Sequence, residues 1–320
     1  MSEILSLSDI RKAAARIQPY LHRTPVMTSQ AIDKLSGARC FFKCENFQKV
    51  GAFKARGALN AVLSLPDESL KNGVATHSSG NHAAALAMAA QIAKVPAYIV
   101  MPGNAPVVKK NAVESYGANI TYCEANLQAR ENGLADIVAK TGAEFIPPFD
   151  DDRIICGQAT VAMELIEDVK NLDLVIAPVG GGGLLSGTAL STHYLSPNSK
   201  VIAAEPEGAN DTFNSFSAGK LIPVEDPCTI ADGLLTSLSE RTFAIIKDYV
   251  EQIVTVSDDT IVSATRLIME RMKIVVEPSA AVALAAILEK QLEVSKLRIG
   301  IILSGGNIDF DSFYSGKNGV

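Results

Sequence analysis

The fold is indicated most clearly by residues 173–187, DLVIAPVGGGGLLSG. A short run rich in β-branched residues leads into four glycines and then into a second apolar segment. This order is typical of a strand, a tight loop and a helix. Similar runs alternate with helical patterns elsewhere, which predicts an α/β fold with parallel sheets and crossover helices. The predicted strands are residues 73–76, 97–101, 119–122, 144–146, 173–177, 200–204 and 297–303.

Two breaks in this pattern suggest how the chain is divided. Proline and acidic residues interrupt the periodicity at residues 65–67 and again at residues 147–152. Such clusters are typical of loops between structural units. We therefore expect a large domain formed by residues 1–70 and 148–320, with residues 71–147 as a small inserted domain.

The composition argues against several classes of protein. The chain has 320 residues, of which 48% are hydrophobic and 20% charged, and its formal net charge of -6 gives no basic field for nucleic acid. No apolar run approaches the roughly 18 residues that span a bilayer, and the first twenty residues do not resemble a signal peptide. The five cysteines form no CxxC pair, which favours a cytoplasmic location over a disulfide framework or a zinc site.

A lysine follows a glycine turn in residues 50–58, VGAFKARGA. Lys54 stands at the start of a helical run that extends to Leu63. The unpaired N–H groups at a helix start disfavour an ammonium, so they favour a free amine that can react with a carbonyl group. Taken by itself the motif is weak, and a solvated surface lysine remains the simpler interpretation.

A second loop lies in residues 74–83, VATHSSGNHA, where a strand passes through small polar residues into an alanine-rich helix. The N–H groups of Ser79, Gly80 and Asn81 would project from the helix start toward a carboxylate or a phosphate. An ordinary helix N-cap formed by Ser79 or Asn81 explains the pattern equally well.

The four glycines Gly180–Gly183 form a third loop, whose backbone can fold into a nest of N–H donors for a phosphate. Glu205 follows at a distance suggestive of a ribose-binding acid, but no register of the glycines satisfies GxGxxG, and no Walker lysine follows. Loops that follow parallel strands meet at one rim of the sheet. A lysine, a carboxylate seat and a phosphate nest around one crevice are what pyridoxal phosphate and an amino-acid substrate require.

Together these motifs resemble the fold-type II pyridoxal-phosphate enzymes, and within them the serine racemases and the serine/threonine dehydratases. The resemblance extends over nearly the whole chain. It implies two open parallel-sheet lobes with flanking helices, as in tryptophan synthase β. It rests on residues 41–49 (FFKCENFQK), on the turn at Lys54, and on residues 78–82, 180–183, 204–206 and 304–307.

The resemblance also implies a cofactor, pyridoxal 5'-phosphate, and a role for each motif. Lys54 is then the Schiff-base lysine, Phe53 a neighbour of the ring, and Asn81 a donor to the 3-oxygen. Ser304 faces the ring nitrogen, where a hydroxyl shares a hydrogen bond but does not keep the nitrogen protonated as an aspartate does. The phosphate is assigned to Gly180, Gly181, Gly182 and Gly183, and substrate binding to Ser78, Ser79, Gly80, Asn81 and His82.

Proton transfer is implied from both faces of the substrate α-carbon, by Lys54 on one face and Ser79 on the other. Two faces permit inversion, and β-elimination to pyruvate and ammonia shares the first proton transfer. We therefore expect a serine racemase with accompanying serine dehydratase activity, acting on a small amino acid. The alternatives are a threonine or 3-hydroxyaspartate dehydratase, a cysteine-synthase-like β-replacement enzyme, and a non-catalytic protein that binds the cofactor.

A cation site is implied at Glu205, the Ala209 carbonyl and Asp211, which would bind Mg²⁺ or Ca²⁺ through oxygen atoms. The spacing of these residues alone favours a solvated acidic loop. Members of the family are commonly homodimers and some respond to ATP, so the resemblance suggests a homodimer and an ATP effector.

Three further residues carry expectations of their own. We expect His82, directly behind the second loop, to make structural hydrogen bonds rather than to act as a general acid. Glu277 either reaches the cofactor or caps the helix that follows it. Phe149 occupies a position that is often polar in the family, so we expect a more apolar distal pocket.

Overall fold

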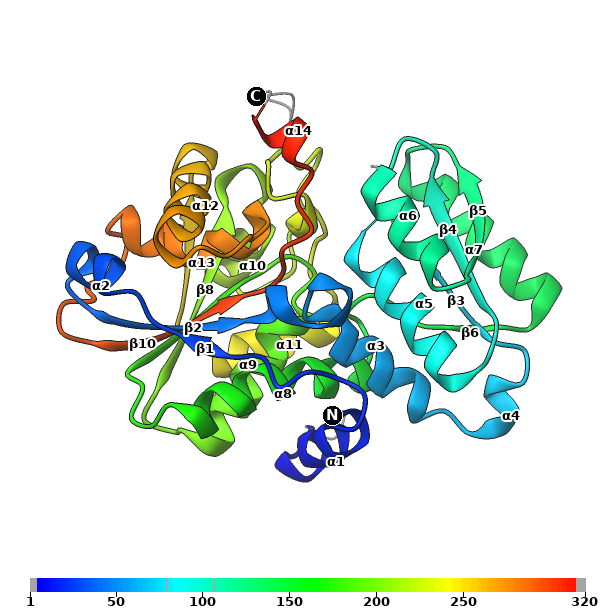
Figure 1. Ribbon diagram of the computed structural model, residues 1–320, viewed down its shortest axis with the longest axis horizontal. Helices are drawn as coiled ribbons and strands as arrows, with labels where there is room; N and C mark the ends of the chain where they lie inside the picture. Colours follow the sequence, from blue (N-terminus) through cyan, green and yellow to red (C-terminus); the bar gives the residue numbers. More distant parts are fainter. Residues whose placement is uncertain (1–4, 79, 106, 315–320) are drawn as a thin grey trace.

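The computed structural model describes residues 5–78, 80–105 and 107–314, and it contains two separate sheets (Figure 1). The larger sheet has six strands in the order β1-β2-β10-β7-β8-β9, and all its pairings are parallel except that of β1 with β2. Its strands are β1 (Val26–Met27), β2 (Arg39–Cys44), β7 (Leu174–Pro178), β8 (Lys200–Pro206), β9 (Gln252–Val256) and β10 (Arg298–Leu303).

The smaller sheet has four parallel strands in the order β5-β4-β3-β6. Helices α5 and α6 pack on it on one side and α7 on the other. We call this sheet with α4 to α7 the small lobe. Its elements are β3 (Val74–His77), β4 (Ala97–Pro102), β5 (Asn119–Cys123), β6 (Glu144–Phe145), α4 (Asp67–Leu70), α5 (Asn81–Ala93), α6 (Val107–Ser115) and α7 (Leu127–Thr141).

We call the six-stranded sheet and the helices around it the large lobe. Helices α2, α12 and α13 share a core with one face of the sheet, and α8, α9 and α11 share a core with the other face (Figure 1). The remaining helices surround this core. The helices are α1 (Leu7–Ile17), α2 (Gln30–Ser36), α3 (Lys54–Leu63), α8 (Asp152–Asp168), α9 (Gly183–Leu195), α10 (Asp211–Ala218), α11 (Glu240–Tyr249), α12 (Asp258–Met272), α13 (Pro278–Leu288) and α14 (Phe310–Tyr314), with 3-10 turns η1 (Glu45–Phe47), η2 (Lys49–Gly51), η3 (Glu207–Ala209) and η4 (Asp232–Leu234).

The buried helices are those whose sequence is apolar all round. In α13 every residue of Pro278–Ile287 is buried, and α5 contains six buried alanines. Such helices have no polar face to turn to water, so they pack between a sheet and a neighbouring helix. Helix α3 lies at the junction of the two lobes, where it contacts both α5 and α8.

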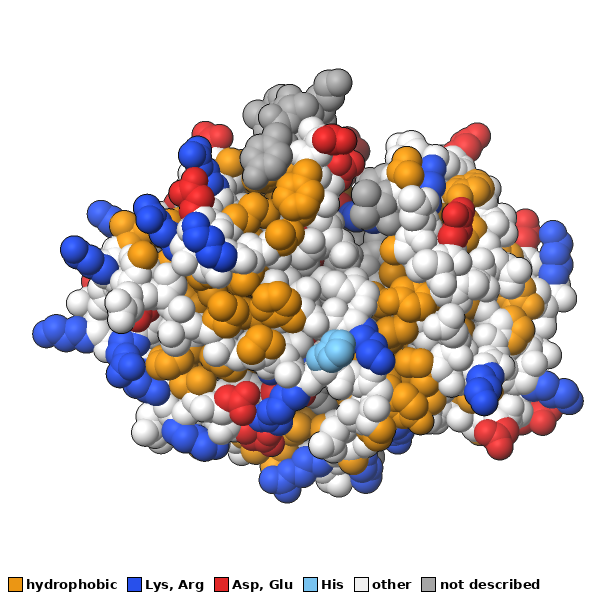
Figure 2. Space-filling view, in the orientation of Figure 1, with side chains coloured by type: hydrophobic (Ala, Val, Ile, Leu, Met, Phe, Trp, Pro, Cys, Tyr) orange, Lys and Arg blue, Asp and Glu red, His pale blue; other side chains and the backbone are white. Residues whose placement is uncertain are grey.

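The seven predicted strands correspond to β3 to β8 and β10. The α/β class with two parallel-sheet lobes is confirmed. Strands β1, β2 and β9 were not predicted, and parallel pairing is wrong for β1, which pairs antiparallel with β2. Among the described residues, no helix is long and apolar enough to cross a membrane. On the face drawn in Figure 2, positive and negative side chains are interspersed.

Candidate active site

Lys54 is the first residue of α3, and its amine makes its contacts inside the protein. Its Nζ donates a hydrogen bond to the Pro148 carbonyl at 2.7 Å and lies 5.2 Å from the centre of the Phe53 ring. Burial lowers the pKa of Lys54 to about 8, although the negative charge of Glu277 opposes this. With such a pKa about one amine in ten is neutral at pH 7. The interpretation as a freely solvated lysine is therefore wrong.

Gly180–Gly183 connect β7 to α9, and their packing leaves no room for side chains. A Cβ at Gly180 would lie 2.9 Å from the Cα of Leu234, and a Cβ at Gly182 would lie 2.7 Å from the Leu238 side chain. Gly182 also has a φ of 86°, which only glycine adopts without strain. Because the first turn of a helix leaves N–H groups without intrahelical acceptors, this loop offers donors to an anion.

Phe149 covers the glycine loop, and the residue before it, Pro148, contacts Lys54. A Cβ at Gly181 would collide with the Phe149 ring, and a Cβ at Gly183 would lie 3.0 Å from the Cβ of Phe149. The preceding residue, Pro148, accepts the hydrogen bond from Lys54. The amine and the loop are thus held by two adjacent residues, one of which is the apolar Phe149.

The second loop joins the end of β3 to the start of α5. Gly80 occupies the N-cap of α5, where no side chain caps the helix, and its N–H donates to Ser78 Oγ at 3.3 Å. Asn81 is the first residue of the helix and not its cap, so the N-cap alternative is wrong for Asn81. Ser79 lies outside the described residues.

The Asn81 side chain joins a hydrogen-bonded group that bridges the two lobes. Its Nδ2 donates to Glu277 Oε1 at 2.9 Å and Oε2 at 3.2 Å, and its Oδ1 accepts from Asn307 Nδ2 at 2.9 Å. Burial raises the pKa of Glu277 to about 7, and repulsion by Asp232 adds to this effect. Glu277 stands at the N-cap of α13, but its side chain makes no capping bond, so that alternative is wrong.

Ser304 follows β10 and is only 3% exposed. Its carbonyl accepts a hydrogen bond from the Phe53 N–H at 2.9 Å. The backbone just before Lys54 is thereby attached to the end of β10. The loops that follow β3, β7 and β10 therefore converge around the start of α3. The rule for parallel sheets predicts this for β7 and β10, which pair in one sheet, whereas β3 belongs to the other sheet.

Comparison with known proteins identifies the family. A sequence model described as pyridoxal-phosphate dependent enzyme matches residues 17–305. The chain belongs to this family. It is 49% identical to serine racemase from Dictyostelium discoideum, over 96% of each chain, and 49% identical to beta-hydroxyaspartate dehydratase from Paracoccus denitrificans, over 96% of this chain and 98% of that one. The solved structure of maize serine racemase is similar with a TM-score of 0.95 and 44% identity, covering 98% of this chain and 97% of that one.

The residues of this site fit pyridoxal phosphate, the cofactor of the family. The glycine loop supplies backbone donors where a Cβ could not be accommodated, and Lys54 supplies an amine that is partly neutral near pH 7. His82 adds a buried donor or acceptor, because its Nδ1 has no partner among the described residues. Its Nε2 lies 3.0 Å from the Ile146 carbonyl, which confirms the structural hydrogen bond expected for it. Burial, with the charge of Lys54, lowers the pKa of His82 to about 3, so the ring is neutral.

Two buried carboxylates lie beyond the glycine loop, near the end of β8. Glu205 is fully buried, and its carboxylate accepts the N–H groups of Thr212 at 3.0 Å and Phe213 at 2.9 Å. Asp211 accepts the N–H of Leu238 at 3.2 Å through Oδ2. The solvated acidic loop that the spacing favoured is therefore wrong for both side chains.

Burial raises the pKa of Glu205 to about 8 and that of Asp211 to about 6. The Asp211 Oδ1 atom is buried without a partner among the described residues. Ala209 lies between them in sequence and is also buried. The described residues contain no group of three or more His, Cys, Asp or Glu side chains that could hold a metal ion. A cation here would therefore need backbone or water oxygens in addition to the two carboxylates.

Several residues near the site had no predicted role. Asn307 stands in the motif at residues 304–307, so a signal for it was present. Pro148, Lys109 and Asp232 have no local signature, because each contributes through a partner distant in sequence. Only the folded chain identifies them.

Proposed function

We propose that this enzyme is a serine racemase that interconverts L- and D-serine and also converts serine to pyruvate and ammonia. The observation that carries the proposal is the partly neutral amine of Lys54, held by Pro148 beside the glycine loop that Phe149 covers. The relatives named serine racemase support the choice of substrate.

Each loop has a separate binding task in this proposal. The N–H groups of Gly180, Gly181, Gly182 and Gly183 hold the cofactor phosphate, while Phe53, Asn81 and the Ser304 hydroxyl border its ring. Bound pyridoxal phosphate supplies an electron sink that acidifies the α-proton of an amino acid. The substrate lies against Ser78, Ser79, Gly80, Asn81 and His82, where the start of α5 favours its carboxylate.

Two residues move the α-proton. The Lys54 Nζ removes it from one face of the α-carbon, and the Pro148 carbonyl orients the amine by accepting its hydrogen bond. The Ser79 hydroxyl donates a proton on the opposite face, which inverts the configuration. When the β-hydroxyl leaves before that proton arrives, the outcome is elimination.

A second candidate is dehydration of 3-hydroxyaspartate or threonine. The relative named beta-hydroxyaspartate dehydratase is as similar in sequence as the relative named serine racemase. Both reactions begin with removal of the α-proton by Lys54, so the two candidates share the same base. They differ in the group on the β-carbon that the pocket must accommodate.

We also propose that Glu205, Asp211 and the Ala209 carbonyl bind Mg²⁺ or Ca²⁺. Two buried carboxylates close together favour a cation, and oxygen ligands suit a hard ion. The site is connected to the glycine loop, because Asp211 accepts the N–H of Leu238, whose side chain packs against Gly182. A bound cation would thereby stabilise the glycine loop.

The remaining proposals rest on the family resemblance. They are a homodimer and an ATP effector. The cysteine pattern supports a cytoplasmic location, and the breaks at residues 65–67 and 147–152 support a large domain of residues 1–70 and 148–320 with a small domain of residues 71–147. Sedimentation and activity measured with and without ATP test the first two.

Chiral product analysis tests the main proposal. With L-serine as substrate we expect D-serine together with pyruvate, and the α-proton of the product should come from solvent, so deuterium enters it in deuterated water. Pyruvate without D-serine would contradict the racemase, and faster turnover of 3-hydroxyaspartate than of serine would favour the second candidate.

Substitution of Ser79 tests the second proton donor. Ser79→Ala should abolish the interconversion of L- and D-serine, because only the face served by Lys54 can then exchange its proton. Elimination should persist, since it needs only the first proton transfer. Racemisation at an undiminished rate in Ser79→Ala would contradict the assignment.

A further inference from the structure

A lysine of the small lobe reaches the large lobe beside the active site. Lys109, near the start of α6, pairs with Asp232 at the start of η4. The Lys109 side chain is 14% exposed and that of Asp232 is 48% exposed, so the pair lies at the edge of the interior. Figure 2 shows a notch between the two lobes at their upper edge.

The two ends of this ion pair contact the two binding segments. On the small lobe, a Cβ at Gly80 would lie 3.6 Å from the Lys109 Nζ, so the lysine packs against the segment proposed to receive the substrate. On the large lobe, η4 lies against the glycine loop, because a Cβ at Gly180 would lie 2.9 Å from the Cα of Leu234. The ion pair therefore connects the substrate segment, on the small lobe, with the part of the large lobe that packs against the glycine loop.

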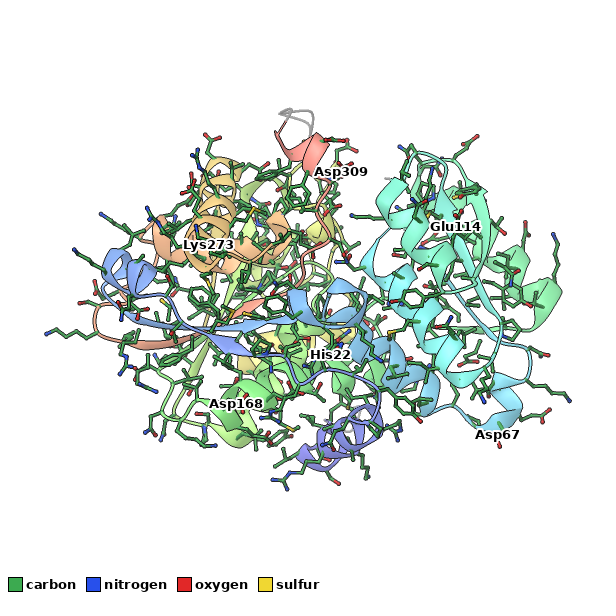
Figure 3. All side chains as sticks on the ribbon, viewed as in Figure 1. His22, Asp67, Glu114, Asp168, Lys273 and Asp309 are labelled. Carbon is green, nitrogen blue, oxygen red and sulfur yellow. The ribbon has the colours of Figure 1, made fainter. Side chains whose placement is uncertain are left out.

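The charges around Lys109 keep it protonated. Burial alone would lower its pKa, but the carboxylates of Asp232, Glu277 and Asp309 raise the pKa above its usual value. Asp309 lies on the segment that leads to α14, on the side toward the small lobe (Figure 3). An ammonium facing acids from the opposite lobe attracts that lobe electrostatically.

We propose that Lys109 is a positioning residue that holds the substrate segment, here Ser78 and Gly80 to His82, against η4 through its ion pair with Asp232. The inference depends on the proposed function in one respect, namely that an amino-acid carboxylate binds at this segment. When the ion pair is intact, the distance between the N–H donors of the substrate segment and those of the glycine loop stays fixed. When it is broken the lobes separate more readily, and the substrate binds less tightly while the proton transfers by Lys54 are unchanged.

Steady-state kinetics of three variants test this role. Lys109→Met and Asp232→Asn should each raise KM for serine about tenfold, which corresponds to roughly 1.4 kcal/mol, with kcat changed less than about threefold. The double variant should be no worse than either single variant, because both remove the same interaction. Additive effects on KM, or a loss confined to kcat, would overturn the proposal.

Lys110→Met is the matched control. Lys110 stands next to Lys109 on the same helix, but its Nζ donates to the Gly103 carbonyl at 2.5 Å and lies 5.3 Å from the Tyr122 ring. These contacts remain within the small lobe. The control should therefore leave KM unchanged, and an equal rise in KM would show that loss of positive charge from α6 is the cause.

Hydrogen exchange of the cofactor-loaded enzyme without substrate gives a readout that does not depend on turnover. In Lys109→Met, the amides of Ser78 and Gly80 to His82 and those of residues 232–234 should exchange faster than in the wild type, whereas Lys110→Met should match the wild type in both segments. Faster exchange confined to α6 would mean a local structural role and would overturn the proposal. An enzyme that fails to turn over serine would instead contradict the proposed function, and the exchange comparison would still decide the role of Lys109.

Discussion

Lys54 and Arg56 stand two residues apart at the start of α3, and both are buried, yet their pKa values shift in opposite directions. Arg56 donates to Glu45 at 2.7 Å through Nε and to Glu164 at 2.7 Å through Nη1. Burial alone would lower its pKa, but these two carboxylates raise it above the usual value. Lys54 has a carbonyl as its hydrogen-bond partner, and its pKa falls to about 8.

The difference distinguishes a charge that stabilises the fold from an amine that can take part in a reaction. Arg56 belongs to a network with Lys43, whose Nζ donates to Glu164 at 2.6 Å, so each charge in it is compensated. A compensated charge holds elements together but does not react. An uncompensated amine readily loses its proton, as a nucleophile or a base must.

Removal of Lys54 should have the largest effect. Lys54→Ala is expected to reduce both racemisation and elimination at least about 1000-fold, because the general base is lost. The variant should also lack the visible absorbance band of the wild-type enzyme with its cofactor. Product assays and an absorbance spectrum check this, and turnover within about tenfold of wild type would contradict the role of Lys54.

Removal of Arg56 should affect stability instead. Arg56→Met leaves Glu45 and Glu164 without their shared partner, and we expect the free energy of unfolding to fall by about 3 to 5 kcal/mol. Urea denaturation measures the change. The control is Arg23→Met, because Arg23 is 51% exposed and pairs with surface acids, so its loss should cost less than about 1 kcal/mol. An equal decrease in the free energy of unfolding in the two variants would contradict the expected difference between buried and exposed ion pairs.

The lowered pKa of Lys54 predicts a pH dependence for cofactor capture by the cofactor-free protein. Below pH 8 the amine is mostly ammonium and cannot attack an aldehyde, so the rate should rise about tenfold from pH 6 to pH 7. It should level off above a pKa of about 8. Stopped-flow absorbance after addition of pyridoxal phosphate measures the rate. Continued increase up to the ordinary lysine value of 10.5 would show that burial does not shift this amine.

The carboxyl groups of Glu205 and Asp211 extend the comparison to buried acids whose pKa burial raises to about 8 and about 6. Addition of Mg²⁺ or Ca²⁺ should raise the melting temperature by a few degrees, because a ligand that binds the native state stabilises it. The increase should be absent in Asp211→Asn and retained in Asp259→Asn, since Asp259 is an exposed acid of α12. An equal melting temperature with chelator and with cation in the wild type would contradict the cation site.

Strands β7 and β10 could be predicted because they are apolar along most of their length. The run at β7 is buried at every position, as expected for a parallel strand covered on both faces. Strand β2 has Arg39 at one end and includes Lys43, a buried lysine whose amine donates to Glu164 and to the Thr24 carbonyl. Strand β1 has two residues and gives no periodic signal. Strand β9 is rich in valine and isoleucine, so its sequence does contain a local signal for a strand.

The active site likewise contains residues that local motifs indicated and residues that they did not. Contiguous motifs indicated Lys54, the glycine loop and the segment at residues 78–82, since a turn and a helix start are local features. The partners of these groups could not be predicted. Glu277 binds Asn81 from 196 positions away, and Asp232 binds Lys109 from 123 positions away, although neither acid has a motif of its own.

The sequence by itself determined which groups are present. They are a lysine at a helix start, a loop of glycines whose close packing excludes side chains, and strands apolar enough to be buried. Tertiary structure decided which buried charges are compensated. Arg56 meets Glu164 across 108 positions and Lys54 meets the Pro148 carbonyl across 94. A pKa depends on the charges and the solvent around a group, and folding brings those neighbours together from distant parts of the chain.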